Sequence, residues 1–91
     1  MNDQEALRQF IDNIRWLYEP EYGDFKRKVG LYIQRLEEAN PQLKSGHAKK
    51  VMTDMRSVVV FTPNGDIEST RRQVIRMAQD LLVGASSGPT H

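Results

Sequence analysis

The sequence of 91 residues contains no cysteine, and this absence excludes both a disulfide framework and a thiolate metal site. Secreted domains of this size usually depend on such cross-links for their stability. A chain without them is typical of a reducing compartment, so we expect a cytoplasmic protein.

Long apolar runs are absent as well. No stretch approaches the roughly 20 consecutive apolar residues that a membrane-spanning helix needs. The polar and acidic start of the chain, with Asp3 and Glu5, differs from the basic start of a signal or transit peptide. We therefore expect neither a targeting segment nor a membrane partner.

The residue patterns of catalytic sites are also missing. The only histidines are His47 and His91, and neither has other ligand residues at a spacing typical of a metal site. Ser45 and Ser57 lie near His47 in the sequence, but a reactive serine also needs an orienting group that converges on the base. No glycine-rich loop is present to bind phosphate. The sequence predicts a non-enzymatic protein without cofactor, metal ion or small-molecule substrate.

What the sequence does contain is the composition of an ordinary globular domain, with 38% hydrophobic and 27% charged residues. Apolar residues recur at helical spacing in four segments, which predicts helices over residues 3–18, 24–39, 45–60 and 67–83. Short connections between them favour antiparallel neighbours. We expect an all-α fold in which these helices form one compact domain over residues 1–84.

One segment has an alternative to helix, and the end of the chain is predicted to lie outside the fold. Residues 58–61 are β-branched and aromatic and precede strong turn residues, so a short strand or hairpin near 58–67 is the alternative to helix there. The absence of a second convincing strand favours helix. Residues 85–91 are small and polar after Gly84, and they predict a disordered C-terminal tail.

Charge is distributed unevenly although the net charge is only +1. Residues 1–25 hold two basic and six acidic groups, whereas residues 26–56 hold eight basic and three acidic groups. This polarity has an internal explanation, because opposite charges on the first two helices can steer their pairing. It also supports an alternative function, nucleic-acid binding by a basic surface on the second and third helices. The residues of that surface would be Lys26, Arg27, Lys28, Lys49, Lys50 and Arg56.

The strongest functional indication is the position of two apolar residues outside the helical stripes. In helical projection Trp16 lies about 150° from the centre of its apolar face, and Leu31 lies well over 100° from that of the second helix. Exposed tryptophan is enriched in interaction hot spots. With Tyr18, which shares the apolar stripe of the first helix, and Tyr22, these residues predict a surface for another protein or for a second copy in a homodimer. The alternative is that a neighbouring helix or the turn at Pro20 covers the indole.

The sequence therefore favours a small protein-interaction module, such as a regulator, adaptor, inhibitor or immunity-type protein. One further residue is unusual: Arg71 falls within the apolar stripe of the last helix. Either that helix begins near Thr70, or the alkyl chain of Arg71 lies along the edge of the core and its guanidinium contacts water or a carboxylate.

Overall fold

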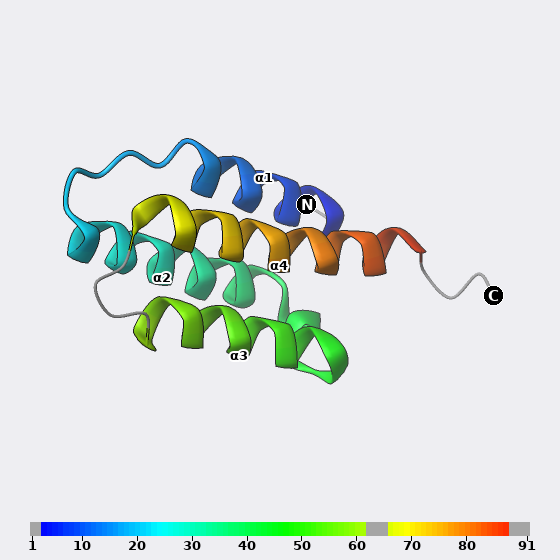
Figure 1. Ribbon diagram of the computed structural model, residues 1–91. Helices are drawn as coiled ribbons and strands as arrows, with labels where there is room; N and C mark the ends of the chain where they lie inside the picture. Colours follow the sequence, from blue (N-terminus) through cyan, green and yellow to red (C-terminus); the bar gives the residue numbers. More distant parts are fainter. Residues whose placement is uncertain (1–2, 62–65, 88–91) are drawn as a thin grey trace.

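The four apolar stripes form four α-helices in the computed structural model, which describes residues 3–61 and 66–87. These helices are α1 (Asp3–Arg15), α2 (Tyr22–Ala39), α3 (Gly46–Phe61) and α4 (Ile67–Ser87), with a short 3-10 helix, η1 (Pro41–Lys44), between α2 and α3. Each α-helix runs antiparallel to the next one in the chain (Figure 1). The predicted all-α helical bundle is confirmed.

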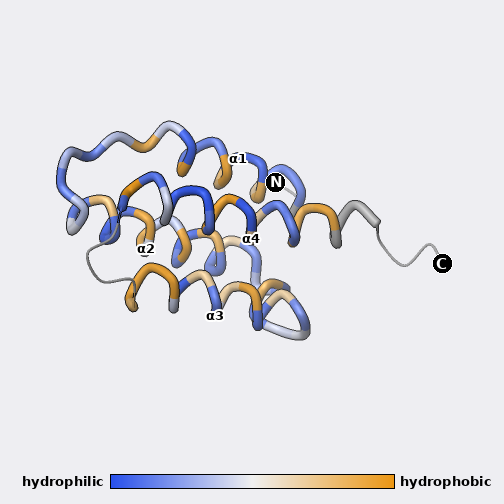
Figure 2. Tube along the Cα trace, in the orientation of Figure 1, coloured by the Kyte–Doolittle hydropathy of each residue, from blue (hydrophilic) through white to orange (hydrophobic). Residues whose placement is uncertain are grey.

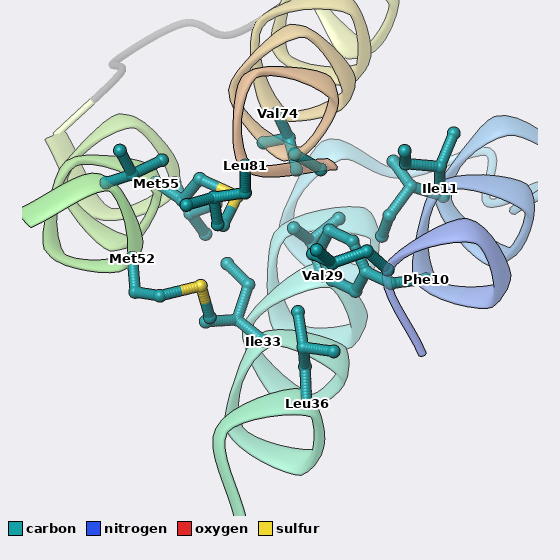
Figure 3. Close-up of a cluster of buried hydrophobic side chains, with 14 of the residues drawn as sticks. Phe10, Ile11, Val29, Ile33, Leu36, Met52, Met55, Val74 and Leu81 are labelled. Atoms are coloured by element: carbon teal, nitrogen blue, oxygen red, sulfur yellow. The ribbon is translucent and has the colours of Figure 1, made fainter. Parts of the chain in front are cut away.

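The helices pack around a shared hydrophobic core. α1 contacts α4 most extensively and also contacts α2, while α3 contacts α4 and α2. Hydrophobic residues recur along all four helices (Figure 2), and their side chains meet in the centre of the bundle (Figure 3). The largest fully buried apolar side chains are Phe25, Leu7, Ile14, Ile33, Met52, Met55, Val29 and Val74. Each contributes about 1.5 to 3 kcal/mol of transfer free energy.

The first helix ends earlier than the sequence predicts. It stops at Arg15 rather than at residue 18, so Tyr18 does not continue the apolar stripe of α1 and its side chain is 81% exposed. Pro20 disfavours helical conformation in the residue before it and cannot continue a helix. A side chain from α4 also binds the last carbonyl groups of α1, as described below.

The second helix begins at Tyr22, two residues before its predicted start. Asp24 therefore lies in the first turn of α2 instead of capping it, and Glu21 occupies the cap position without a side-chain hydrogen bond. An aspartate in the first turn still interacts favourably with the positive end of the helix dipole.

Residues 58–61 are helical, so the strand alternative for them is wrong. Val59 packs into the core from α3, as its helical spacing from Met52 and Met55 requires. The rest of the proposed hairpin includes residues 62–65, which lie outside the described residues. α4 continues to Ser87 instead of ending near Gly84, and residues 88–91 of the predicted tail also lie outside the described part.

None of the helices within residues 3–61 and 66–87 is long and apolar enough to cross a membrane.

Candidate partner-binding surface

Two aromatic side chains project from the connection between α1 and α2, which we call the aromatic turn (residues 16–21). The side chain of Trp16 is 78% exposed and that of Tyr18 is 81% exposed. The interpretation in which Pro20 or a neighbouring helix covers the indole is therefore wrong. Aromatic side chains of this size are costly to leave in water unless another molecule buries them.

Arg71 of α4 fixes the start of the aromatic turn. Its Nη1 atom lies 2.7 Å from the carbonyl oxygen of Ile14, 2.8 Å from that of Arg15 and 2.9 Å from that of Leu17. These carbonyl groups lie at the end of α1, where helix geometry leaves the last four without an intrahelical donor. A cation is also favourable there because it faces the negative end of the helix dipole.

The guanidinium of Arg71 is itself held in place. Its side chain is only 14% exposed, and its Nε and Nη2 atoms each donate to the carboxylate of Glu68 over 3.2 Å. The guanidinium carbon lies 5.2 Å from the centre of the Phe25 ring, within the range of a cation–π interaction. The expected position of Arg71 at the edge of the core is confirmed, but most of its hydrogen bonds go to backbone carbonyls.

Two further contacts hold the other end of the aromatic turn. Glu19, whose side chain is 16% exposed, accepts a hydrogen bond from Lys28 Nζ over 2.5 Å. This hydrogen bond, together with the charge of Glu19, raises the pKa of Lys28. The hydroxyl of Tyr22 lies 2.8 Å from Oγ1 of the fully buried Thr70. The backbone that carries Trp16 and Tyr18 is thus attached to α2 and α4 on both sides.

The structure brings two of the four predicted interface residues together. Trp16 and Tyr18 share the aromatic turn, but Tyr22 is half-buried and its hydroxyl is used within the domain. Leu31 is 42% exposed on α2. It lies nine residues after Tyr22, about 14 Å along the helix axis, so it is not part of the same patch.

Most of the predicted nucleic-acid-binding cations already have partners. Lys26 Nζ lies 3.5 Å from the carbonyl oxygen of Val60. Four others form ion pairs: Arg27 with Asp24, Lys28 with Glu19, Lys50 with Asp54 and Arg56 with Glu37. Within the described residues only Lys49 of the six has no side-chain partner. Phosphate contacts would have to compete with these pairs.

The six cations also do not form one patch. Residues 26–28 lie near the start of α2 and residues 49–50 near the start of α3, and these helices are antiparallel (Figure 1). Lys26 contacts Val60, which lies eleven residues after Lys49 on α3, about 16 Å along the axis. The two groups therefore lie toward opposite ends of the bundle.

Two open grooves on either side of α2 have no counterpart in the sequence-based prediction. One, of about 260 Å³, lies between α1 and α2 and has Phe10 and Leu36 in its apolar lining and Arg35 in its polar lining. The other, of about 280 Å³, lies between α2 and α3. A mid-helix glycine, Gly30, lines the second groove and was the only sequence signal that could have pointed to it.

The residues considered for catalysis remain separate from one another. His47 is exposed in the first turn of α3, and Ser45 Oγ donates to the carbonyl of Gln42 over 3.4 Å. No group of three His, Cys, Asp or Glu side chains within the described ranges is arranged to hold a metal ion.

Comparisons of the chain with protein-family models, with curated proteins and with solved structures find no match. Its function has to be inferred from its own residues.

Proposed function

We propose that this protein is a non-catalytic interaction module that binds a partner protein through Trp16 and Tyr18. The observation that carries the proposal is the combination of high exposure and firm attachment in the aromatic turn. Both aromatic side chains lie in solvent, while the connection between α1 and α2 is held by Arg71, which donates to the carbonyl of Leu17, and by Lys28, which donates to the carboxylate of Glu19.

The attachment matters because association is opposed by the entropy of ordering the interface. A turn that is already held in one conformation loses less entropy on binding than a mobile one. Trp and Tyr also offer a large apolar area together with a polar group that can donate a hydrogen bond to the partner. These properties support an anchor role for the two residues.

The biological roles that fit are those of a small regulator, adaptor, inhibitor or immunity-type protein, acting in the cytoplasm by occupying a surface of its partner. The cysteine-free composition supports the location. The partner is another protein or a second copy of this chain, and the experiment below distinguishes the two.

The test compares Trp16→Ala and Tyr18→Ala with Phe61→Ala, a matched control in which an aromatic side chain of 76% exposure lies on α3 instead. Tagged proteins are used to capture binding partners, which are identified by mass spectrometry, and each purified partner is then titrated by calorimetry. We expect truncation of Trp16 to weaken binding by about 2 kcal/mol or more and truncation of Phe61 to leave it unchanged.

Self-association is measured with the same variants by sedimentation velocity over a dilution series. A dimer that the Trp16 variant dissociates would identify the partner as a second copy. Equal binding by the wild type and both turn variants, in hetero- and self-association alike, would refute the proposal.

The nucleic-acid alternative has less support. Five of its six cations are paired with acidic groups or a backbone carbonyl, and the six are divided between two ends of the bundle.

A further inference from the structure

The α2–α3 groove is open to solvent and has an apolar floor. It is lined by Gly30, Ile33 and Gln34 from α2 and by Arg56, Val59 and Val60 from α3. Ile33 is fully buried and Val59 nearly so, whereas Val60 is 60% exposed on the rim. The accessible apolar surface of the groove therefore comes mainly from Val60 at one edge, above the buried Ile33 and Val59.

Gly30 is unexplained by the domain itself. It is the ninth of the 18 residues of α2, and a glycine at such a position lowers helix stability relative to alanine. Its φ is not in the left-handed region, and a Cβ atom added there would meet no atom within 4 Å apart from the neighbouring residues and backbone of its own helix. Neither a turn nor close packing inside this chain requires it. The absence of a side chain at this position lowers one wall of the groove and leaves the α2 backbone accessible to a partner.

Two cations lie on the α3 side of the groove. Arg56 lines the groove and remains 47% exposed although it pairs with the buried Glu37. Lys49 lies seven residues, or two turns, before Arg56, so it shares the same face of α3. Lys26 lies one turn before Gly30 on the opposite wall.

From these features we propose that the α2–α3 groove docks an acidic amphipathic helix of a partner protein. An apolar side chain of that helix lies over Gly30 and packs against Val60 and the exposed edge of Val59. Its carboxylates pair with Lys49, whose side chain has no partner within the described residues, and with the exposed part of Arg56. This is the helix-in-groove mode of recognition, in which apolar anchors at helical spacing give affinity and flanking charges give orientation.

The occupant has to come from another protein. The apolar stripes of the described helices face their own core, and the large exposed apolar residues on these helices, Leu31, Val60, Phe61 and Val83, are divided among three helices. A second folded copy therefore offers no apolar stripe at i, i+3, i+4 spacing from its described residues. The basic groove also disfavours the equally basic α2–α3 face of another copy and favours an acidic segment.

This site is separate from the aromatic turn and goes beyond the function proposed above. None of the residues that line the groove belongs to residues 16–21. The two surfaces can therefore be tested independently, and Arg72→Ala, a substitution at an exposed position of α4 outside both surfaces, serves as the control for the groove.

The probe is a fluorescein-labelled synthetic helix of about 18 residues with leucines at i, i+3, i+4 and i+7 spacing on one face and glutamates on the other. A matched peptide carries lysine in place of every glutamate. Binding to the full chain is followed by fluorescence anisotropy, and the folding of each variant is followed by circular dichroism and its Tm.

Gly30→Leu should fill the groove and weaken binding of the acidic peptide by roughly tenfold or more. Its Tm should equal or exceed that of the wild type, because leucine favours helix and the added Cβ has space. Lys49→Glu should also weaken binding of the acidic peptide, Arg72→Ala should leave it unchanged, and the lysine peptide should not bind.

Gly30→Ala is the second variant, for the case in which Gly30→Leu does not fold. If Gly30→Leu loses helical content, the acidic peptide should bind Gly30→Ala more weakly than the wild type while the Tm of Gly30→Ala is raised. Unchanged peptide binding by Gly30→Ala would overturn the proposal. Absence of acidic-peptide binding, equal affinity for both peptides, or unchanged affinity in a folded Gly30→Leu protein would each overturn the proposal. A homodimer that Gly30→Leu dissociates would also overturn it, because it would place a second copy in the groove.

Discussion

At the scale of single residues, Arg71 determines the conformation of the aromatic turn more than any residue within it. One guanidinium nitrogen serves three backbone carbonyl groups from residues 14–17, and the rest of the group is oriented by Glu68 and Phe25. The single nitrogen of a lysine could donate to these carbonyl groups, but it could not also hold Glu68 through a second pair of donors as Nε and Nη2 of Arg71 do.

We therefore predict that Arg71→Ala lowers the free energy of unfolding by about 2 to 3 kcal/mol, because it leaves carbonyl groups at the end of α1 without their charged donor. Arg71→Lys should recover only part of this loss. Both values are obtained from urea unfolding followed by circular dichroism.

Arg72→Ala is the matched control, since Arg72 is exposed and has no side-chain partner within the described residues. Its substitution should change the free energy of unfolding by no more than about 0.5 kcal/mol. A similar loss in Arg71→Ala and Arg72→Ala would show that the capping contacts do not stabilise the domain.

At the scale of the elements, the sequence predicts the helices well and the connection between them poorly. Apolar spacing places all four helices, because burial of one face dominates helix position. The end of α1 at Arg15 was missed, and its last carbonyl groups accept hydrogen bonds from Arg71, which lies more than fifty residues away. No local pattern contains that contact.

Sequence reasoning likewise predicts only part of the candidate site. Helical projection places the indole of Trp16 opposite the apolar stripe but leaves open whether another element covers it, and the structure shows that it is exposed. The hydrogen bond of Tyr22 to Thr70 depends on the position of α4, and the groove beside Gly30 depends on the position of α3. A single sequence does not provide these positions.

The ion pair that joins the aromatic turn to α2 gives a prediction for pH dependence. Glu19 raises the folded-state pKa of Lys28 above its ordinary value of 10.5. The stabilisation is therefore fully present below the unfolded-state pKa and is lost as pH rises through the higher folded-state value. The difference in Tm between the wild type and Lys28→Met should be constant from about pH 7 to about pH 9 and decrease above about pH 10.5.

Arg27→Met provides the comparison for this measurement, because guanidinium groups stay charged over the whole range. The difference in Tm between the wild type and Arg27→Met should not decrease in the same interval. If the difference in Tm for Lys28→Met also stays constant above about pH 10.5, the Glu19–Lys28 pair does not hold the turn in solution.

At the scale of the whole molecule, the distribution of charge separates the two functions that the sequence left open. A nucleic-acid-binding surface needs cations that can exchange their counterions for phosphates, and each such contact adds to the salt dependence of binding. In this protein the basic residues of α2 and α3 are largely paired, while residues 1–25 carry an excess of acidic groups. That arrangement favours protein partners over phosphate backbones.

The corresponding prediction concerns binding to a labelled DNA duplex and a labelled single-stranded RNA, measured by anisotropy at about 50 mM and about 200 mM salt. We expect weak binding at the lower salt concentration and none at the higher one, with little change in Lys49→Ala/Lys50→Ala, because Lys50 already pairs with Asp54. Tight binding that falls by about a thousandfold between the two salt concentrations would require six or more phosphate contacts. If the double variant also weakened that binding, nucleic acid would replace a protein as the partner of α2 and α3.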